Sequence, residues 1–371
     1  MKHPKLVLLL TDPLTVNAFF VHHIQVLSNH YEVHLLVGHG YNSIKNLPAT
    51  IHITGLSRKP NPIADLKTLF LLVRLIKKLE PTILLSVTPK AGLVGQLAAA
   101  ICRTPFRIHY FTGQVWVTQT GIARHILKKF DVLIGKLSSH LLTDSPSQLS
   151  FLIEQKVTEK QKIQVLGHGS ISGVDLDKFK PNPEERKQIR SQLGLSENSL
   201  VFLFLGRLNR DKGIDELITA YKALPTNAYL LLVGPCENTK LLENLPNNCF
   251  YVSQSSQPEK YYAAADIFVL FSKREGFGTS ALEASAAGLP VIASKIYGLT
   301  DAVAENETGL LVELGDYRGL RNAMLKLMED SQLRTRLGVA GRERASKQFS
   351  NQVASAHLLT FLQGLGNQEI K

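Results

Sequence analysis

Cysteine is scarce in this 371-residue sequence. It has three cysteines, Cys102, Cys236 and Cys249, and no two of them are close enough to form a C-x-x-C pair. Disulfide-stabilised secreted domains and cysteine-rich zinc sites need several cysteines at short spacings, so the sequence excludes both classes. The cysteine content therefore favours a reducing compartment, the cytoplasm.

Long apolar runs are also missing. No segment approaches the roughly 20 apolar residues of a membrane-spanning helix, and the best candidate, Leu66–Leu75, contains Lys67 and Arg74. The apolar residues Leu6–Leu10 stop before Asp12, which is shorter than the about 7–15 apolar residues of a secretory signal. We therefore expect a cytoplasmic protein whose membrane contacts are peripheral.

Acidic residues are few in the first half of the chain. Residues 1–173 contain 19 lysines and arginines but 8 aspartates and glutamates, whereas residues 174–371 contain 23 of each kind. The whole formal net charge of +11 thus lies in residues 1–173. This imbalance predicts an anionic partner for the first half, such as nucleic acid, phospholipid or a phosphorylated acceptor. A basic surface that is merely solvated is the alternative.

Short apolar runs alternate with amphipathic stretches in the first half. The expected strands are Lys5–Leu10, Glu32–Val37, Thr82–Val87, Arg107–Phe111, His140–Thr143 and Lys162–Leu166. The expected helices are Val16–Asn29, Ile63–Leu79, Gly92–Cys102, Ile122–Leu137 and Pro146–Gln155. This alternation predicts a parallel sheet with helices on both faces.

The alternation stops at residues 168–183, which are rich in Gly, Ser, Asp and Pro and are expected to form a linker. A second series of strands is expected at Leu200–Leu205, Ala228–Val233, Cys249–Val252, Ile267–Phe271, Pro290–Ala293 and Gly309–Val312. Its helices are expected at Gly213–Ala223, Thr279–Ala287, Gly319–Met328 and Asn351–Leu362. The fold class is therefore α/β, with two doubly wound Rossmann-like domains that face a cleft. Their expected bounds are residues 1–170 and 171–350, followed by a tail helix over residues 351–371.

The first candidate site is the loop Gly206–Gly213, which follows an expected strand and opens an expected helix. Glycine lets a ligand approach the backbone closely, and a helix start offers free N–H groups to an anion. Arg207 and Lys212 add two positive charges that suit a phosphate. The loop therefore indicates a phosphate site, with an ordinary charged surface turn as the alternative.

The second candidate site follows the expected strand Ile267–Phe271. Glu275 stands just before the turn Gly276–Gly278, and Glu283 lies about one turn into the helix expected from Thr279. A carboxylate can accept hydrogen bonds from two hydroxyl groups of a sugar or a ribose, and the N–H groups of a helix start suit a diphosphate. The pattern therefore predicts a nucleotide-sugar site. Because the helix of Glu283 is small and apolar, this carboxylate needs a partner.

These motifs resemble those of the retaining GT-B glycosyltransferases of family 4. The segment Glu275–Glu283 matches the E-x7-E motif of that family, and the linker Gly169–Phe179 is similar to the family's linker. The other matching segments, in the family's order over about residues 160–350, are Gly206-Arg207, Lys212-Gly213, Asp266–Leu270, Gly288–Ala293 and Gly309–Val312. The resemblance favours the branch that builds bacterial surface polysaccharides. It also implies that the tail helix over residues 351–371 crosses back onto the first domain.

The resemblance implies a role for each matched residue. Arg207 and Lys212 would neutralise the donor diphosphate, and Glu275 would contact the donor sugar as the third catalytic residue. Glu283 would hold the ribose hydroxyl groups. The remaining donor-binding residues would be Gly206, Gly276, Phe277, Gly278 and Thr279, with Val252 and Gln254 near the nucleotide base.

The first half departs from the family pattern in two places. Many members have a glycine pair after the first strand, whereas Thr11–Asn17 contains no glycine. Many members also have a histidine-glycine pair after the fourth strand, where this sequence has Thr112 and Gly113. His109 is expected to face the core. The expected acceptor-side residues are Asn17, Lys90, Thr112 and Gly113, and Lys90 would hold an acceptor phosphate where Gly92 opens a helix.

No metal or other cofactor is expected. No group of His, Asp and Glu residues has the spacing of metal ligands, and two fixed cations already face the predicted diphosphate. Asp175-Leu176-Asp177 spells the D-x-D signature of a different glycosyltransferase fold. It lies in the linker, so we expect it to cap a loop.

The resemblance implies a function. The protein would transfer a sugar from a UDP-sugar, with an N-acetylated sugar as one candidate, in capsule or O-antigen synthesis. It would retain the anomeric configuration. The net positive charge of residues 1–173 adds the hypothesis that the acceptor is a lipid-diphosphate-linked glycan. Two alternatives stay open: a nucleotide-sugar epimerase of similar fold, which would process the donor without an acceptor, and a basic nucleic-acid-binding protein. The second should show aromatic residues interleaved with positive charge on a sheet, and the sequence has no such pattern, so no nucleic-acid partner is expected.

A membrane hypothesis follows from the basic half. Trp116, the single tryptophan, suits a membrane interface, and each basic residue near an anionic leaflet adds about 1 kcal/mol. The stretch Arg124–Phe130 interleaves such residues, including Lys128 and Lys129, with apolar ones. We expect this half to dock on the inner face of the plasma membrane. The alternative is that Trp116 packs in the core and the lysines are solvated.

Overall fold

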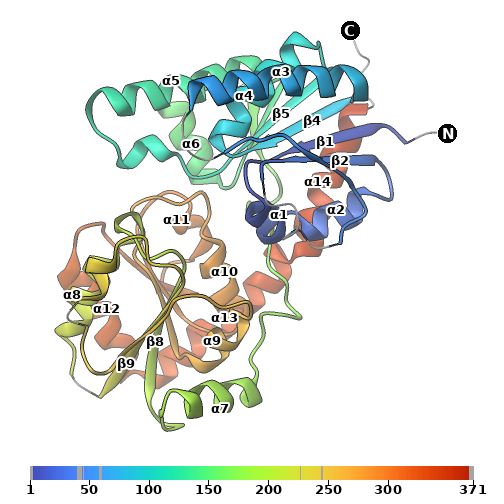
Figure 1. Cartoon of the computed structure of the whole chain (residues 1–371). Helices are drawn as coiled ribbons and strands as arrows, with labels where there is room; N and C mark the ends of the chain where they lie inside the picture. Colours follow the sequence, from blue (N-terminus) through green and yellow to red (C-terminus); the bar gives the residue numbers. More distant parts are fainter. Residues whose placement is uncertain are drawn as a thin grey trace. The chain divides into compact units, whose positions relative to one another are not determined.

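The computed structural model describes residues 3–39, 44, 46–57, 61–225, 227–243 and 245–366. The chain forms two compact units (Figure 1): one combines residues 1–173 with residues 351–371, and the other contains residues 174–350. The first expected domain boundary precedes the structural one by three residues. Residues 367–371 of the expected tail helix lie outside the described residues.

The first unit is built on a parallel sheet. Its described strands are β1 (Lys5–Leu9), β2 (Glu32–Val37), β3 (Thr50–Ile53), β4 (Ile83–Val87), β5 (Phe106–Phe111), β6 (His140–Thr143) and β7 (Ile163–Val165). They follow the order β3-β2-β1-β4-β5-β6-β7. The helices are α1 (Pro13–Phe19), α2 (Val21–Leu27), α3 (Pro62–Leu79), α4 (Pro89–Ile101), α5 (Gly121–Leu137), α6 (Pro146–Glu154) and α14 (Asn351–Gly366).

Strand β1 contributes to two cores, one on each face of the sheet. Leu6 and Leu8 pack in a cluster that includes residues of α1, α2 and α14, whereas Val7 and Leu9 pack in a cluster with residues of α3 and α4. In Figure 1, α3, α4 and α5 lie together over one face of the sheet. Burial on both faces explains why this strand is apolar from Leu6 to Leu9.

The second unit has a parallel sheet of the same kind. Its described strands are β8 (Leu200–Leu205), β9 (Ala228–Val233), β10 (Cys249–Val252), β11 (Ile267–Leu270), β12 (Val291–Ser294) and β13 (Gly309–Val312). They follow the order β10-β9-β8-β11-β12-β13. The helices are α7 (Pro183–Gln192), α8 (Ile214–Lys222), α9 (Glu259–Ala264), α10 (Thr279–Ala286), α11 (Leu299–Ala302), α12 (Tyr317–Glu329) and α13 (Ser331–Phe349).

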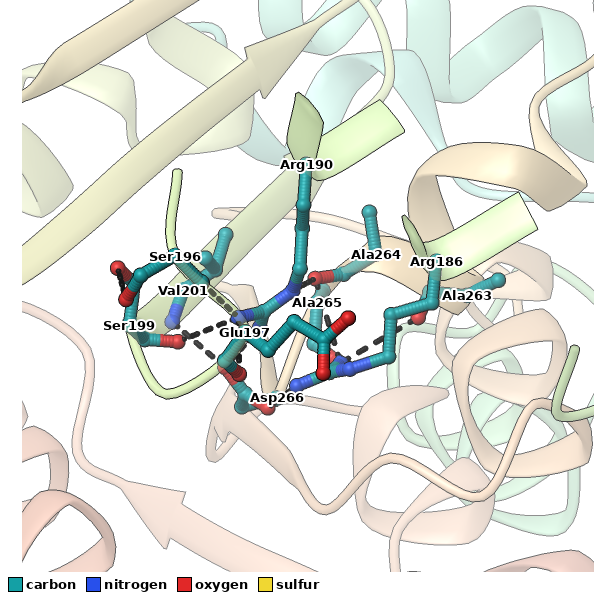
Figure 2. Close-up of polar contacts among 10 residues, drawn as sticks. All are labelled: Arg186, Arg190, Ser196, Glu197, Ser199, Val201, Ala263, Ala264, Ala265 and Asp266. Carbon is teal, nitrogen blue, oxygen red and sulfur yellow. Dashed lines mark hydrogen bonds and ion pairs between the residues drawn. The ribbon is translucent and has the colours of Figure 1, made fainter. Parts of the chain in front are cut away.

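A partly buried ion-pair cluster anchors α7 to this sheet (Figure 2). Asp266, just before β11, accepts from Arg186 at 2.6 Å and from Arg190 at 2.7 Å, and it also accepts the backbone N–H of Val201 at 2.8 Å. The Arg190 side chain is 1% exposed, and its remaining donors bind backbone carbonyl groups, including those of Ala264 and Ser199. Every charge in the cluster thus has a partner, as a buried guanidinium requires.

Several elements differ from the expected ones. The single helix expected over Val16–Asn29 is two helices, because the backbone leaves helical geometry at Phe20 (φ −118°). Helix α4 begins at Pro89 rather than at Gly92. The elements β3, α7, α9, α11 and α13 were not expected. The sequence pattern does not predict helix α13, because most of its buried residues, such as Gly338, Gly341 and Ala345, are small. The helical repeat of large apolar residues is therefore weak.

Within the described part of the chain, no helix is both long enough and apolar enough to span a bilayer.

Candidate functional site

The sheet of the second unit reverses its strand order between β8 and β11. Ligands in such sheets bind beyond the carboxyl ends of the strands, at the point of reversal. The two candidate loops, Gly206–Gly213 after β8 and Phe271–Gly278 after β11, start at these two neighbouring strand ends. The structure therefore brings the two loops together at the edge where a ligand is expected.

Three ion pairs join the first loop and the following helix α8 to the second loop. Asp211 accepts from Arg274 at 2.9 Å, Glu216 of α8 pairs with Lys273 at 2.8 Å, and Lys212 contacts Glu275. The backbone N–H of Lys273 also donates to the carbonyl of Asp211 at 2.7 Å. Sequence reasoning missed the first two pairs, because their partners are more than 50 residues apart and each charge by itself is typical of a surface loop.

Gly213 allows the two loops to lie this close. Its φ is +66°, in the left-handed region, and a Cβ atom at this position would collide with the carbonyl oxygen of Phe271. A residue with a side chain would therefore be strained and would also push the loop after β11 away. Gly213 is the N-cap of α8, which agrees with the expected helix start.

Lys212 and Glu275 form the centre of the joined loops. The carboxylate of Glu275 also accepts from the hydroxyl of Ser272 at 2.8 Å, and its side chain is 13% exposed. Lys212 is 21% exposed. A cation and a carboxylate are thus held together at the sheet edge while both keep some access to solvent.

Arg207 is exposed and has an acidic partner of its own. It donates to Oε1 of Glu237 at 2.6 Å, and Asn209 donates to Oε2 of Glu237 at 2.8 Å. The bond from Asn209, followed by the charge of Arg207, lowers the pKa of Glu237. Glu237 lies in the loop after β9, so this third loop borders the site, which the sequence reasoning did not foresee.

The turn before α10 presents backbone rather than side chains. Gly278 is the N-cap, with φ +94° and no side-chain hydrogen bond at the cap. Gly276 is buried, Thr279 is partly buried, and the Phe277 ring is 2% exposed and packs against Phe349 at 5.1 Å. Any ligand contact of Phe277 therefore comes from its backbone.

Glu283 has the partner that its buried helix requires. The hydroxyl of Tyr262 in α9 donates to Oε2 of Glu283 at 2.8 Å and also contacts the carbonyl of Ser280 at 3.2 Å. Burial raises the pKa of Glu283 to about 7, and the bond from Tyr262 opposes this rise. A carboxylate that costs this much to ionise suggests a functional group rather than a cap.

The two residues predicted near the nucleotide base lie farther along the sheet edge. Val252 ends β10, an outer strand of the described sheet, and its carbonyl accepts from the N–H of Gly234 at 2.9 Å. Gln254 is exposed. The structure therefore places them two strands away from β8 and gives them no contact with the Lys212–Glu275 pair.

In the first unit, the sheet order reverses between β1 and β4. Asn17 lies in α1, which follows β1, and Lys90 lies in the first turn of α4, which follows β4. Lys90 forms an ion pair with Asp65 at 2.6 Å. Thr112 and Gly113, both partly buried, follow β5. The expected acceptor residues thus lie at one edge of one sheet.

His109 faces the core, as expected. It is 1% exposed, its Nδ1 is 2.9 Å from the Ser86 hydroxyl, and burial lowers its pKa to about 3, so the ring is neutral at physiological pH. A Cβ atom on Gly92 would collide with the His109 ring. Gly92 therefore allows close packing against His109. The expectation that Gly92 opens the helix is wrong, because α4 begins at Pro89.

The expectation that Trp116 reaches a membrane interface is wrong. The side chain is 1% exposed, stacks on Phe151 at 5.4 Å and donates its indole N–H to Asp131 at 2.7 Å. Lys128 lies over the Trp116 ring and donates to Gln155 at 3.1 Å. The alternative, a core tryptophan, is confirmed, because the ring belongs to the buried apolar cluster that includes Phe111 of β5 and Leu141 of β6.

The D-x-D sequence behaves as a loop cap. The carboxylate of Asp175 accepts the backbone N–H groups of Asp177 and Lys178, each at 3.0 Å. Across the described ranges, no cluster of three or more His, Cys, Asp or Glu residues is arranged to hold a metal ion.

Known proteins are similar to this chain in sequence and in fold. A family model described as "Glycosyl transferases group 1" matches residues 185–344. The capsular polysaccharide biosynthesis glycosyltransferase CapM of Staphylococcus aureus is 31% identical over 332 residues, which cover 87% of each protein. The UDP-Gal:alpha-D-GlcNAc-diphosphoundecaprenol alpha-1,3-galactosyltransferase of Escherichia coli is 28% identical over 291 residues, 75% of this chain and 74% of the relative. The structure of sucrose-phosphate synthase from Thermosynechococcus elongatus matches with a TM-score of 0.84 at 22% identity, over 98% of this chain and 99% of that one, so the fold is GT-B.

Proposed function

The chain belongs to the group 1 glycosyltransferases, family 4, and on that premise we propose its substrates. We propose that it transfers a sugar from a UDP-sugar, with retention of the anomeric configuration, to a lipid-diphosphate-linked glycan of a bacterial capsule or O-antigen. Membership makes it a transferase (EC 2.4) and decides against the epimerase and nucleic-acid-binding alternatives.

The names of two relatives support these substrates. The S. aureus relative is a capsular polysaccharide glycosyltransferase, and the E. coli relative uses UDP-Gal and a diphosphoundecaprenol-linked sugar. Their similarity extends over both halves of the chain, since it covers 87% and 75% of it. A UDP-sugar donor and a lipid-diphosphate acceptor are therefore the first substrates to test.

The donor assignment is carried by one observation, the contact of Lys212 with Glu275 at the carboxyl edge of β8 and β11. A diphosphate placed at this edge meets Lys212, Arg207 and the free N–H groups before α10. Its sugar then lies beside Glu275, and its ribose hydroxyl groups reach Glu283. Lys212 changes partner in this arrangement, from the carboxylate to the phosphate.

Catalysis on this proposal is mainly electrostatic. The bond between the anomeric carbon and the diphosphate oxygen breaks while the acceptor hydroxyl bonds to the same face of the sugar. The departing diphosphate takes the electron pair, is stabilised by Lys212 and Arg207, and accepts the proton of the acceptor hydroxyl. Fixed cations that meet charge as it develops contribute a few kcal/mol each.

The acceptor side is proposed to include Asn17, Lys90, Thr112 and Gly113. All four follow the carboxyl ends of β1, β4 or β5, where a ligand of this sheet is expected. Because Lys90 already pairs with Asp65, an acceptor phosphate has to compete with that carboxylate.

Two helices of the first unit support membrane docking. Along α5, the side chains of Ile122, Ile126, Phe130 and Leu133 are 79%, 48%, 41% and 40% exposed and form one stripe. Along α3, Ile63, Leu66 and Phe70 are 73%, 54% and 68% exposed. Both helices also carry exposed basic residues, such as Lys67, Lys78 and Lys129. We propose that this α3–α5 surface, rather than Trp116, contacts anionic lipid.

The proposal is tested by assaying transfer with UDP-glucose, UDP-galactose, UDP-N-acetylglucosamine and UDP-N-acetylgalactosamine. The acceptor is synthetic N-acetylglucosamine-diphosphate-polyprenol, alongside a bacterial lipid extract. We expect one donor to add one sugar to a diphosphate-linked lipid. Consumption of a donor with no glycosylated lipid would overturn the acceptor class.

A further inference from the structure

A small cavity lies at the carboxyl edge of β4 and β5 in the first unit. Its lining includes Thr88, His109, Thr112, Gly113 and Asp131. Its volume of about 10 Å³ is at the lower limit for one water molecule or one hydroxyl group. Two of these residues, Thr112 and Gly113, are proposed acceptor-side residues.

Asp131 of α5 is a buried carboxylate in this cavity. It is 5% exposed, and its Oδ2 accepts the indole N–H of Trp116 at 2.7 Å. Among the described residues, no lysine, arginine or histidine forms an ion pair with it. Burial raises the pKa of Asp131 to about 7, and the bond from Trp116 opposes this rise. A carboxylate that is buried without a cation destabilises the fold when it is ionised. Packing alone therefore does not explain an aspartate at this position.

The charged groups around Asp131 do not compensate it. His109 of β5 is neutral, since burial lowers its pKa to about 3. Lys90 of α4 pairs with Asp65. Arg124 and Lys128 of α5 lie over the Trp116 ring, 5.6 and 5.5 Å from its centroid, and contact the indole rather than the carboxylate. Within the described part of the chain, the indole N–H of Trp116 is thus the only group that donates a hydrogen bond to this carboxylate.

The cavity also contains a strained residue. Thr88 has φ +72° and ψ +141°, a conformation that a β-branched residue avoids. Its hydroxyl oxygen is 2.6 Å from that of Thr11, which follows β1. Such strain persists where the surrounding structure holds it, and it clusters at ligand sites. It is a second observation, independent of Asp131, that points to a ligand at this place.

We propose that the cavity receives one hydroxyl group of the acceptor glycan and that Asp131 accepts its hydrogen bond. The inference rests on the proposed function, because it names a contact of the acceptor in that reaction. Trp116 is a positioning residue: its N–H holds one carboxylate oxygen and leaves the other for the acceptor. Asp131 takes no proton in this scheme, since the departing diphosphate accepts it.

The proposal has a pH signature. The carboxylate is the stronger hydrogen-bond acceptor when ionised, so kcat/KM for the acceptor falls as the pH drops below about 7. Removing the indole N–H in Trp116→Phe raises the pKa of Asp131 and moves this acid limb to higher pH. In Asp131→Asn the group no longer titrates, so the Asp131 limb is absent.

Trp116 supplies a direct reporter, because it is the single tryptophan of the chain. In the wild type, its fluorescence should change with pH around a midpoint near 7, and Asp131→Asn should abolish this transition. Addition of N-acetylglucosamine-diphosphate-polyprenol should also change the emission of the wild type. An emission that is independent of both pH and this acceptor would overturn the proposal.

The kinetic test compares Asp131→Asn with Phe151→Leu, a packing control that disturbs the ring stacked on Trp116 but leaves the carboxylate. Asp131→Asn should lower kcat/KM for the acceptor about tenfold to a hundredfold, the usual value of a hydrogen bond to a charged group. UDP affinity and acceptor-independent donor hydrolysis should change less than about twofold. Phe151→Leu should leave the pH profile unshifted.

The outcomes separate the two proposals. If the wild type transfers sugar and a folded Asp131→Asn transfers it equally well with the same acid limb, the Asp131 inference is overturned and the proposed function stands. If the wild type glycosylates no diphosphate-linked lipid, the proposed acceptor fails, and the inference fails with it. If Asp131→Asn unfolds, the acid limb of Trp116→Phe decides, and an unshifted limb contradicts the proposal.

Discussion

Lys212 contacts the carboxylate of Glu275, although the two residues are 63 positions apart. The contact joins the loop after β8 to the loop after β11, and the Asp211–Arg274 and Glu216–Lys273 pairs join the same part of the sheet edge. In a partly buried pair each charge stabilises the other. On the proposed function, a donor diphosphate that pairs with Lys212 would also release Glu275 to bind a hydroxyl group.

Replacing Lys212 by methionine should lower kcat/KM for transfer about 100-fold, because one fixed cation at the departing diphosphate is lost. The assay is initial-rate kinetics, with circular dichroism to show that the variant is folded. Lys222→Met is the matched control, since this exposed lysine ends α8 away from the loop, and it should retain full activity. Near-normal kinetics of a folded Lys212→Met would remove the donor assignment.

UDP affinity should depend on pH through Glu283. Its pKa is raised to about 7, so the carboxylate is ionised above pH 7 and protonated below it, and the affinity should fall as the pH drops through 7. Tyr262→Phe removes the hydrogen bond that favours the ionised form, so the midpoint should move to higher pH. Calorimetric titration with UDP from pH 5.5 to 8.5 measures both effects.

The neighbouring Tyr261→Phe is the control for this experiment, since the structure shows no contact of Tyr261 with Glu283. It should keep the wild-type midpoint. A UDP affinity that is flat across pH 7 in the wild type, or equal midpoints in the two variants, would count against the ribose-binding role of Glu283.

Two glycine substitutions should have opposite effects on stability. In Gly92→Ala the new Cβ collides with the His109 ring, and we expect a loss of about 1–3 kcal/mol in the free energy of unfolding. In Gly364→Ala nothing lies within 4 Å of the new Cβ, so a helical alanine should add about 0.5–1 kcal/mol. Urea unfolding of both variants measures these changes. A Gly92→Ala variant that is more stable than the wild type would contradict the close packing of Gly92 against His109.

The sequence predicted the strands well where burial on both faces demands apolar residues. All six strands expected in the second unit are present, and the run Leu6–Leu9 is a central strand of the first. The strand β3 has no buried residue, so it has no such signal. Helix boundaries differ from the expected ones where a single residue interrupts the helix, as Phe20 does between α1 and α2.

The site was predictable only in part. The need of Glu283 for a partner followed from its apolar helix, but Tyr262 could not be named, because it lies in a helix that itself was not expected. Asp131 was overlooked because a single acidic residue in a basic amphipathic helix is typical of a solvated face. The expectation for Trp116 was wrong for a related reason: local composition does not show whether an aromatic ring faces the core or the solvent.

Membrane binding should depend on the α3–α5 surface. The double variant Ile122→Asp/Phe130→Asp removes two exposed apolar side chains and adds negative charge, so sedimentation with phosphatidylglycerol vesicles should fall several-fold. Val339→Asp, at a 63% exposed position of α13 in the second unit, is the control. The wild type should bind anionic vesicles more strongly than phosphatidylcholine vesicles, and less at high salt. Equal sedimentation with both lipids at low salt would contradict the docking surface.

Transfer should continue without a divalent metal. Arg207 and Lys212 lie where the diphosphate is proposed to bind, and they supply the positive charge that a metal ion supplies elsewhere. Treatment with EDTA followed by gel filtration should leave kcat unchanged. Activity that disappears and returns with Mg²⁺ or Mn²⁺ would show that the two cations are insufficient.

The most direct test of the central claim is a mass-spectrometric transfer assay with the wild type and Glu275→Gln. We predict that the wild type releases UDP from one UDP-sugar and adds the mass of that sugar to a diphosphate-linked lipid. Glu275→Gln, folded and still able to bind UDP, should form at least about 100-fold less product. Equal product formation by Glu275→Gln, or no transfer from any UDP-sugar by the wild type, would contradict the account.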